Sequence, residues 1–301
     1  MKKYQVISLL MLANLFWAGN YVFGKYVVSD MTPVQMTFTR WLIAIILLFP
    51  IAHWVEHPDW KNVWKQWKSL LILSILGIMG YNLLLYEALR FTTSMNAALV
   101  NSMNPALIVL FSVLFLSERI SLTNGVGLFI SLIGVLLVLT NGQLWNLFFI
   151  HYNLGDLIMI AVILLWTFYT IYGKRMHHIP PITSTAITAL MAVIILFPFI
   201  LSQGYDFHLS KQAISGIIYI GLFPSVGSFI FWNASVRHIG ASKAGIYLNL
   251  ITVFTAIISI LLGKGITLAQ IIGGLLVFLG VYLSNQKVKP KAEESHQAIA
   301  K

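Results

Sequence analysis

The sequence contains no cysteine, and only 9% of its 301 residues are charged, whereas 58% are hydrophobic. The lack of cysteine excludes disulfides, thiolate metal sites and a cysteine nucleophile. So little charge over this length, together with a mean hydropathy of +0.85, excludes a soluble domain. The composition therefore indicates an integral membrane protein.

Ten apolar segments can be drawn, each of roughly 18–24 residues and therefore long enough to cross about 30 Å of hydrocarbon. The first is too long for the apolar region of a signal peptide, so we retain it as a span. We predict an all-α integral membrane fold with these ten transmembrane helices. Their expected limits are residues 5–27, 34–52, 69–89, 93–116, 122–140, 153–173, 182–201, 213–235, 241–262 and 267–285.

The two halves of the sequence align on each other, with Trp17 falling on Trp166. The other aligned pairs are Gly24 and Gly173, Lys25 and Lys174, Pro33 and Pro181, Gly80 and Gly227, Arg90 and Arg237, Ile120 and Ile266, Gly127 and Gly273, and Gly134 and Gly280. Because each half holds five spans, an odd number, the second copy must lie upside down in the bilayer. Many transporters alternate access around such inverted repeats.

The sequence accordingly predicts two inverted five-helix repeats with short connections. The first repeat covers residues 1–142 and the second covers residues 153–286. Residues 143–152 are expected to form an external linker, and residues 287–301 a cytoplasmic tail.

Basic residues are distributed unevenly between the two expected sides of the membrane. With the N-terminus in the cytoplasm, fourteen lysines and arginines lie on the cytoplasmic side and four lie outside. The positive-inside rule therefore places both termini in the cytoplasm of a multi-pass cell-membrane protein. The net charge of +10 is an orientation signal, so we predict no nucleic-acid partner.

The connection between the second and third spans has the pattern of an amphipathic helix. After Asp59, which suits a helix N-cap, Trp60, Trp64 and Trp67 recur on one helical face and lysines on another. This pattern predicts a short helix at the headgroup level, with the lipid bilayer as its partner. Contact with a substrate is the alternative.

Small residues recur in the fifth and tenth spans at spacings that let helices approach closely. They are Gly127, Ser131, Gly134, Gly273, Gly274 and Gly280. Packing within one chain and a homodimer interface are both compatible with the pattern. Neither span carries a charged residue, so we assign both to the scaffold.

The sequence His53-Trp54-Val55-Glu56-His57 matches the H-x-x-E-H pattern of inverted zinc peptidases. That mechanism needs both histidines on one face of a continuing helix and a third ligand. Pro58 should end the helix directly after this segment. We therefore predict neither a metal site nor a cofactor.

Polar side chains inside membrane spans are energetically costly and are candidates for function by default. In the first span Trp17, Asn20 and Tyr21 share a face, and the sixth span repeats the pattern with Trp166 and Tyr169. Further candidates come from the third, fourth, eighth and ninth spans: Asn82, Tyr86, Asn101, Asn104, Trp232, Asn233, Tyr247 and Asn249. We predict that these residues line a substrate cavity. The alternatives are hydrogen bonds between helices or an aromatic belt at the membrane surface.

Two charged residues, Arg40 and Glu87, are expected in the outer part of the bilayer. Burying either alone would cost several kcal/mol, so we expect a mutual pair or a cavity. Their aligned counterparts, Thr188 and Ala234, carry no charge. A purely architectural need should recur in both copies, so the asymmetry favours substrate or proton handling over a structural ion pair.

Several stretches together resemble the EamA family of the drug/metabolite transporter superfamily. They are Phe16-Trp17-Ala18-Gly19-Asn20-Tyr21, Ala88-Leu89-Arg90-Phe91-Thr92, Asn96-Ala97-Ala98-Leu99, Leu116-Ser117-Glu118-Arg119, Gly240-Ala241-Ser242-Lys243-Ala244 and Leu248-Asn249-Leu250. The resemblance implies a secondary transporter whose central cavity is built by spans 1–4 and 6–9, with spans 5 and 10 outside it. Lys264 and Thr252 depart from the family pattern, in which glutamate and proline are usual.

The predicted function is a secondary transporter, in the export direction, of small amphipathic metabolites such as amino acids, working by alternating access. An intramembrane lipid-modifying or hydrolytic enzyme is one alternative. It would need a nucleophile and base, or a metal cluster, at one depth, and no span pairs a histidine with an acid. A channel or scaffold protein is the other alternative.

Overall fold

The computed structural model describes residues 1–92, 94–149, 153–204, 209–263, 265 and 267–284, and within them the chain is helical without strands. In this part of the chain nine helices are long and apolar enough to cross a membrane. A tenth apolar helix, Leu268–Ser284, has 17 residues and lies at the position expected for the last span. The predicted all-α membrane architecture is confirmed. The expected tail, residues 150–152 of the linker and Lys264 lie outside the described residues.

Six of the expected spans are unbroken helices. They are α1 (Lys3–Val27), α2 (Pro33–Glu56), α8 (Leu122–Thr140), α9 (Leu154–Arg175), α10 (Pro181–Gln203) and α15 (Leu268–Ser284).

The remaining four spans are broken. They consist of α4 (Trp67–Leu73), η1 (Ser74–Gly80) and α5 (Tyr81–Phe91); α6 (Ser94–Asn101) and α7 (Asn104–Leu116); α11 (Lys211–Leu222), η3 (Phe223–Ser228) and α12 (Phe229–Ile239); and α13 (Ala241–Ile246), η4 (Tyr247–Asn249) and α14 (Leu250–Leu261). They occupy the third and fourth places in each half, so the breaks follow the sequence repeat. Short helices α3 (Trp60–Trp64) and η2 (Leu144–Phe149) lie between spans.

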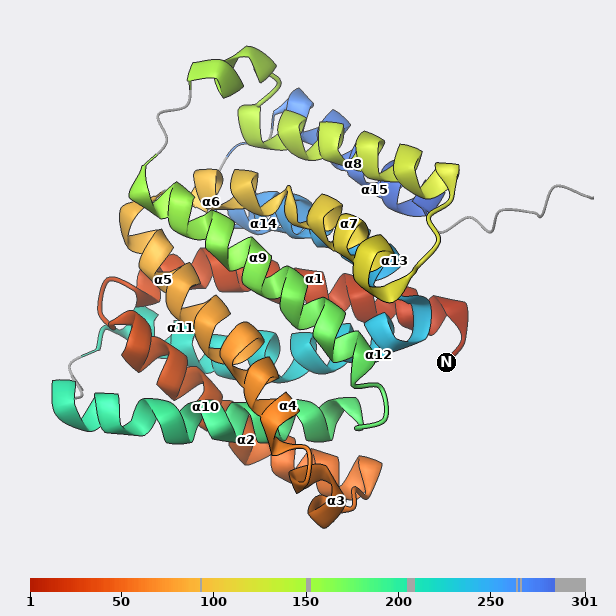
Figure 1. Ribbon diagram of the computed structural model, residues 1–301. Coiled ribbons are helices and arrows are strands. Elements are labelled where there is room, and N and C mark those ends of the chain that lie inside the picture. The colour runs from red at the N-terminus through yellow and green to blue at the C-terminus, as the bar shows by residue number, and fades with distance from the viewer. Residues whose placement is uncertain (93, 150–152, 205–208, 264, 266, 285–301) are drawn as a thin grey trace, which may run out of the picture.

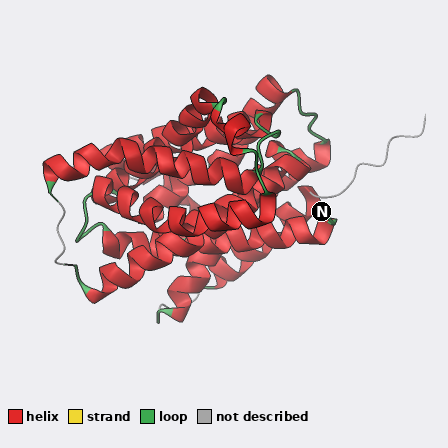
Figure 2. Cartoon of the chain, turned by 90° about the horizontal axis from the view of Figure 1, so that it is seen from below, coloured by secondary structure: helices red, strands yellow, loops and turns green. Residues whose placement is uncertain are grey.

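The helices run back and forth between two ends of the bundle (Figure 1). We call the end that carries Lys3 and Arg175 the proximal end, and the end that carries Val27 and Leu154 the distal end. Helix α1 starts at the proximal end and α9 at the distal end, so the two halves have opposite orientations. The loops gather at these ends, with helices side by side between them (Figure 2).

Helices α8 and α15 pack against each other at the edge of the bundle (Figure 1). A Cβ atom on Gly127 would lie 2.5 Å from the carbonyl oxygen of Gly280, and one on Gly134 would lie 2.5 Å from that of Gly273. The small residues therefore serve packing within the chain. The homodimer through spans 5 and 10 stays a prediction.

The third and eighth spans each contain a π-helical segment, η1 and η3. A π turn disturbs the usual pairing of backbone carbonyl groups, which then need other donors. The Asn82 side-chain amide donates to the Ile78 carbonyl at 2.7 Å, and the Ser225 hydroxyl donates to the Ile220 carbonyl at 2.8 Å. These two polar side chains are thereby fixed beside their π turns.

The segment after the second span is helical only in part. Asp59 caps α3 by accepting a hydrogen bond from the backbone N–H of Asn62 at 3.2 Å, as predicted. Trp60 stacks on Phe49, with ring centroids 5.6 Å apart. Trp67, however, begins α4 instead of extending the α3 stripe, because the helix stops at Trp64. The prediction of one continuous amphipathic stripe was therefore wrong at its last residue.

Candidate functional site

Aromatic side chains from both halves meet at the centre of the bundle. Trp17 on α1 and Trp166 on α9, which the repeat aligns, contact edge to face with ring centroids 5.0 Å apart. Trp232 lies 5.6 Å from Trp17 and 5.8 Å from Trp166, and Phe229 contacts both. All four are buried. The predicted aromatic faces do come together, but here they pack on one another as a core.

Arg40 on α2 is 1% exposed and lies on the distal side of this core. Its Nε donates to the Ser225 hydroxyl at 2.8 Å, and one terminal nitrogen donates to Asn82 Oδ1 and to the Tyr86 hydroxyl. The Tyr86 hydroxyl donates to Asn20 Oδ1 at 3.0 Å. Arg40 therefore joins the residues held by both π turns, one from each half of the chain.

Among the described residues, every hydrogen-bond partner of Arg40 is a neutral group. The ion pair found among the described residues is Arg90 with Glu87, 3.1 Å apart and partly exposed. The predicted pairing of Arg40 with Glu87 was wrong. Glu87 and Arg90 are three residues apart and share one helical face, whereas Asn82 and Tyr86 share the face that meets Arg40.

A second polar cluster lies in the proximal half. Asn233 Nδ2 donates to the Tyr169 hydroxyl at 2.8 Å and to the Thr185 hydroxyl at 3.2 Å. The repeat aligns Tyr169 with Asn20 and Asn233 with Tyr86. The same hydrogen bond between the same two spans thus occurs in both halves, with the asparagine and the tyrosine exchanged.

The other predicted site residues are also buried, but they are more dispersed. Asn104 accepts a hydrogen bond from the Thr167 hydroxyl at 3.1 Å, and Asn249 donates to the Ser131 hydroxyl at 2.9 Å. Both contacts join two spans. They agree with the alternative prediction for these residues, hydrogen bonding between helices instead of cavity lining. Tyr21, Asn101 and Tyr247 are buried as well.

Hydroxyl side chains complete these clusters, and the sequence analysis did not predict their hydrogen bonds. They are Ser131, Thr167, Thr185 and Ser225. Serine and threonine are common in membrane helices, where many bond only to their own backbone. Ser225 alone carried a usable signal, because it follows Pro224 in a span and lies beside a disturbed backbone.

Two carboxylates tie the halves together at the proximal end. Glu56 accepts from the backbone N–H groups of Ile182 and Thr183 at 2.9 and 2.7 Å and from the Thr183 hydroxyl. Glu118 binds Ala241 and Ser242 in the same manner, through two N–H groups and the Ser242 hydroxyl. Each first-half carboxylate thus caps a second-half helix. Within the H-x-x-E-H segment Glu56 thus serves as a helix cap, and α2 ends before Pro58, as predicted.

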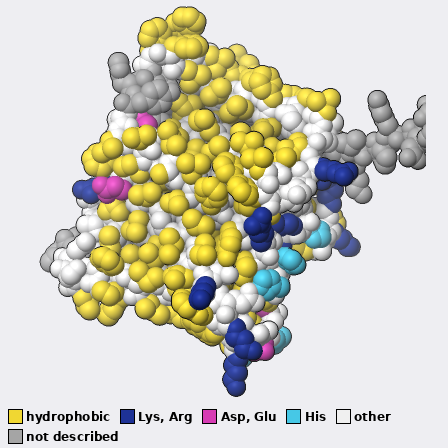
Figure 3. Space-filling view, in the orientation of Figure 1, with side chains coloured by type: hydrophobic (Ala, Val, Ile, Leu, Met, Phe, Trp, Pro, Cys, Tyr) yellow, Lys and Arg dark blue, Asp and Glu magenta, His cyan; other side chains and the backbone are white. Residues whose placement is uncertain are grey.

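Two aligned lysines cap opposite ends of the bundle. Lys25 Nζ donates to the carbonyl of Leu89 at 2.8 Å at the distal end, and Lys174 Nζ donates to the carbonyl of Arg237 at 2.7 Å at the proximal end. Each lysine satisfies the last turn of the third span of its own half, where a cation also interacts favourably with the helix dipole. Lysine and arginine side chains gather toward the proximal end on the face shown in Figure 3.

The family model described as the EamA-like transporter family matches residues 5–140 and again residues 153–286. The chain belongs to the EamA-like transporter family. Its two matched segments coincide with the two halves that repeat in the sequence and in the fold. The resemblance stated from the motifs is therefore confirmed.

Similar proteins support the same assignment. An uncharacterized transporter of Bacillus subtilis, YyaM, is 29% identical over 99% of both chains. An uncharacterized transporter of Archaeoglobus fulgidus is 27% identical over 93% of this chain and 96% of its own. A crystal structure that is 18% identical superposes with a TM-score of 0.79 over 94% of this chain and 99% of that one, which shows the shared fold. The protein is a multi-pass membrane protein of a transporter family.

Proposed function

We propose that this EamA-family protein is a secondary transporter that exports small amphipathic metabolites bearing a carboxylate, amino acids among them, by alternating access. Its termini lie in the cytoplasm, and its membrane is the cell membrane. The proximal end is then the cytoplasmic end, in keeping with the excess of lysine and arginine there.

The observation that carries this proposal is Arg40. A guanidinium that is 1% exposed and bonded only to neutral groups leaves a buried positive charge uncompensated by the described side chains around it. Such a charge is costly unless an anion approaches it. A planar guanidinium matches a carboxylate in geometry, and the adjoining aromatic core suits the apolar part of an amphipathic solute.

The arrangement of the two ends supports alternating access. At the proximal end Glu56 and Glu118 hold the start of α10 and α13 against the first half. The π turns in η1 and η3, both bonded to residues that hold Arg40, give the third and eighth spans a place to bend. A carboxylate that neutralises Arg40 would change the hydrogen bonds from Arg40 to Asn82 and Ser225. Because these two residues are bonded to the two π turns, the change would reach both halves.

Flux in proteoliposomes tests the proposal. We expect transport of a carboxylate-bearing solute to fall roughly 10- to 100-fold in Arg40→Met, because a charge-assisted hydrogen bond contributes about 1.5–3 kcal/mol. Arg40→Lys should retain part of the flux, and flux of the matching amidated solutes should change much less. Thr188→Val at the aligned position is the control, because the Thr188 hydroxyl bonds only to carbonyls of its own helix.

Equal loss for carboxylate and amidated solutes in a well-folded Arg40→Met protein would make Arg40 an architectural residue. Absence of flux for every tested solute, with the protein monodisperse and folded, would count against transport itself.

A further inference from the structure

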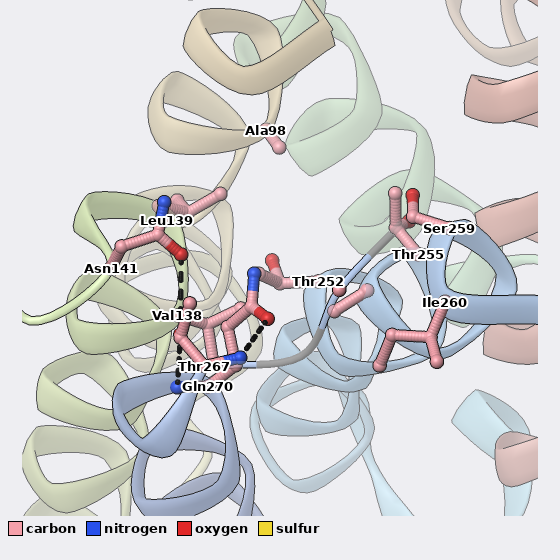
Figure 4. A pocket seen from close by; sticks show the side chains of 12 residues that line it. Ala98, Val138, Leu139, Asn141, Thr252, Thr255, Ser259, Ile260, Thr267 and Gln270 are labelled. Carbon is pink, nitrogen blue, oxygen red and sulfur yellow. Dashed lines mark hydrogen bonds between the residues drawn. The ribbon is translucent and has the colours of Figure 1, made fainter. Parts of the chain in front are cut away.

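A cavity of about 360 Å³ opens at the distal end between the scaffold pair α8 and α15 and the ends of α6 and α14 (Figure 4). Its polar lining comes from three elements: Thr252, Thr255 and Ser259 on α14, Asn141 after α8, and Thr267 and Gln270 at the start of α15. The helices that the sequence assigned to scaffold therefore contribute polar groups to a pocket. No role for this pocket follows from Arg40 or from the aromatic core.

The hydroxyl groups on α14 differ from most others in the bundle. Thr167, Thr185 and Ser112 each donate to the carbonyl four residues earlier in their own helix, which is the usual way to satisfy a hydroxyl in a helix. Thr255 and Ser259 make no hydrogen bond within the described part of the protein, although both line the cavity. Unsatisfied donors and acceptors facing one cavity are what a bound polar solute would use.

The lining of the cavity carries no charged side chain among the described residues. Among the described lining residues an ion would find no counter-charge for the hydration it loses, whereas a solute without net charge could exchange water for hydroxyl and amide partners. Thr267 is hydrogen bonded to both Gln270 and Asn141, and these three residues form a wall opposite α14 (Figure 4). The chemistry therefore selects solutes that have several hydrogen-bonding groups and zero net charge.

The cavity lies one helical turn from two predicted substrate residues. Ala98 and Thr252 line it, and Asn101 and Asn249 follow three residues deeper on the same two spans. The Oδ1 atom of Asn249 is buried and has no hydrogen-bond partner within the described chain. An unpaired acceptor beneath the cavity floor is costly unless something binds there in part of the cycle.

We infer that this distal cavity is a binding site for small solutes without net charge, zwitterions included, held by the Thr255 and Ser259 hydroxyls against the Asn141–Gln270 wall. It would be the last station of an exported solute before release, and in that respect it rests on the proposed function. Binding at the cavity itself does not depend on transport.

The absence of native cysteine makes a direct test possible, because an introduced cysteine is the only thiol. Ser259→Cys protein in lipid nanodiscs, with both ends accessible, is labelled with a water-soluble maleimide. The competing probes are amino acids with neutral side chains, their N-acetyl derivatives (net negative) and their amides (net positive). We expect the free amino acids to slow labelling about fivefold or more, the factor that one hydrogen bond supplies, and the charged derivatives to have little effect.

Two further variants locate the effect. Thr255→Val keeps the side-chain volume but removes the hydroxyl, so protection in the Ser259→Cys background should weaken about fivefold. Leu261→Cys, at the exposed distal end of the same helix and outside the cavity lining, should be labelled at a rate that no probe changes. Thr255→Cys provides the same measurement if Ser259→Cys does not fold.

The inference would be overturned if the charged derivatives protected as strongly as the free amino acids. It would also be overturned if no class of probe protected the cysteine. Because the measurement needs no flux, its failure is distinct from that of the proposed function. Adding Arg40→Met separates them further, since flux should be lost while protection at Ser259→Cys is retained.

Discussion

The two halves of the molecule make the same hydrogen bond with exchanged partners. In the distal cluster the Tyr86 hydroxyl binds Asn20, and in the proximal cluster the Asn233 amide binds the Tyr169 hydroxyl. The distal bond also supports a buried guanidinium, whereas the proximal one reaches only the Thr185 hydroxyl. The repeat determines where two spans are joined, and single residues found in one half only determine whether the junction carries charge.

Removing one hydroxyl from each cluster should reveal this difference most strongly. Tyr86→Phe removes one of the three acceptors of Arg40 and leaves Asn20 Oδ1 without its donor, so we expect a loss of about 3 kcal/mol in stability and at least a tenfold loss of flux. Tyr169→Phe affects only Asn233, which keeps its bond to Thr185, and should cost about 1 kcal/mol. Thermal melts in one detergent, together with proteoliposome flux, measure both variants. Equal costs would mean that the charge of Arg40 adds nothing to the distal junction.

The carboxylate at Glu118 is a second one-sided feature, and its repeat counterpart in the sequence is Lys264. Glu118→Gln replaces one accepting oxygen by a donor that faces the N–H groups of Ala241 and Ser242. We expect a stability loss of about 1.5–2 kcal/mol and faster labelling of a cysteine introduced at the proximal end. Glu87→Gln is the matched control, since its exposed ion pair with Arg90 contributes about 0–1 kcal/mol. If labelling at the proximal end is unchanged in Glu118→Gln, this carboxylate does not hold the proximal end closed.

The smallest expected effect lies in the distal loop. Hydrogen bonds from Ser210, and then from Ser29, lower the pKa of Asp30 below its usual value. Its ionised form is therefore stabilised by folding at neutral pH, and this contribution is lost as the pH falls through the lowered pKa. Asp30→Asn should melt slightly below the natural protein at neutral pH, and the difference should vanish in acid. A difference that persists at low pH would show that Asp30 acts through something other than its charge.

The sequence predicted the membrane helices and their inverted repeat, because hydropathy and self-alignment report span position and depth directly. It selected Trp17 and Trp166 as cavity-lining candidates, and it did not predict that their rings contact each other. It failed for Glu87, since equal depth in the membrane does not place two side chains on facing helix surfaces. A π turn precedes Asn82 on the same span and changes the rotation of the helix there. Ser225 and Thr185 were not assigned to the clusters, because the residues to which they are hydrogen bonded, Arg40 and Asn233, are distant in sequence.

The π turns also control the rotational phase of the residues that follow them. An α-helix advances about 100° per residue, so removing one residue from Ser74–Gly80 and restoring a regular α-helix would rotate Asn82 and Tyr86 by about that angle relative to the turns before them. Both side chains would then leave the arc that faces Arg40, although no residue of the cluster had been replaced. In each half, the π-helical segment of the third span thus sets the direction in which the side chains after it point.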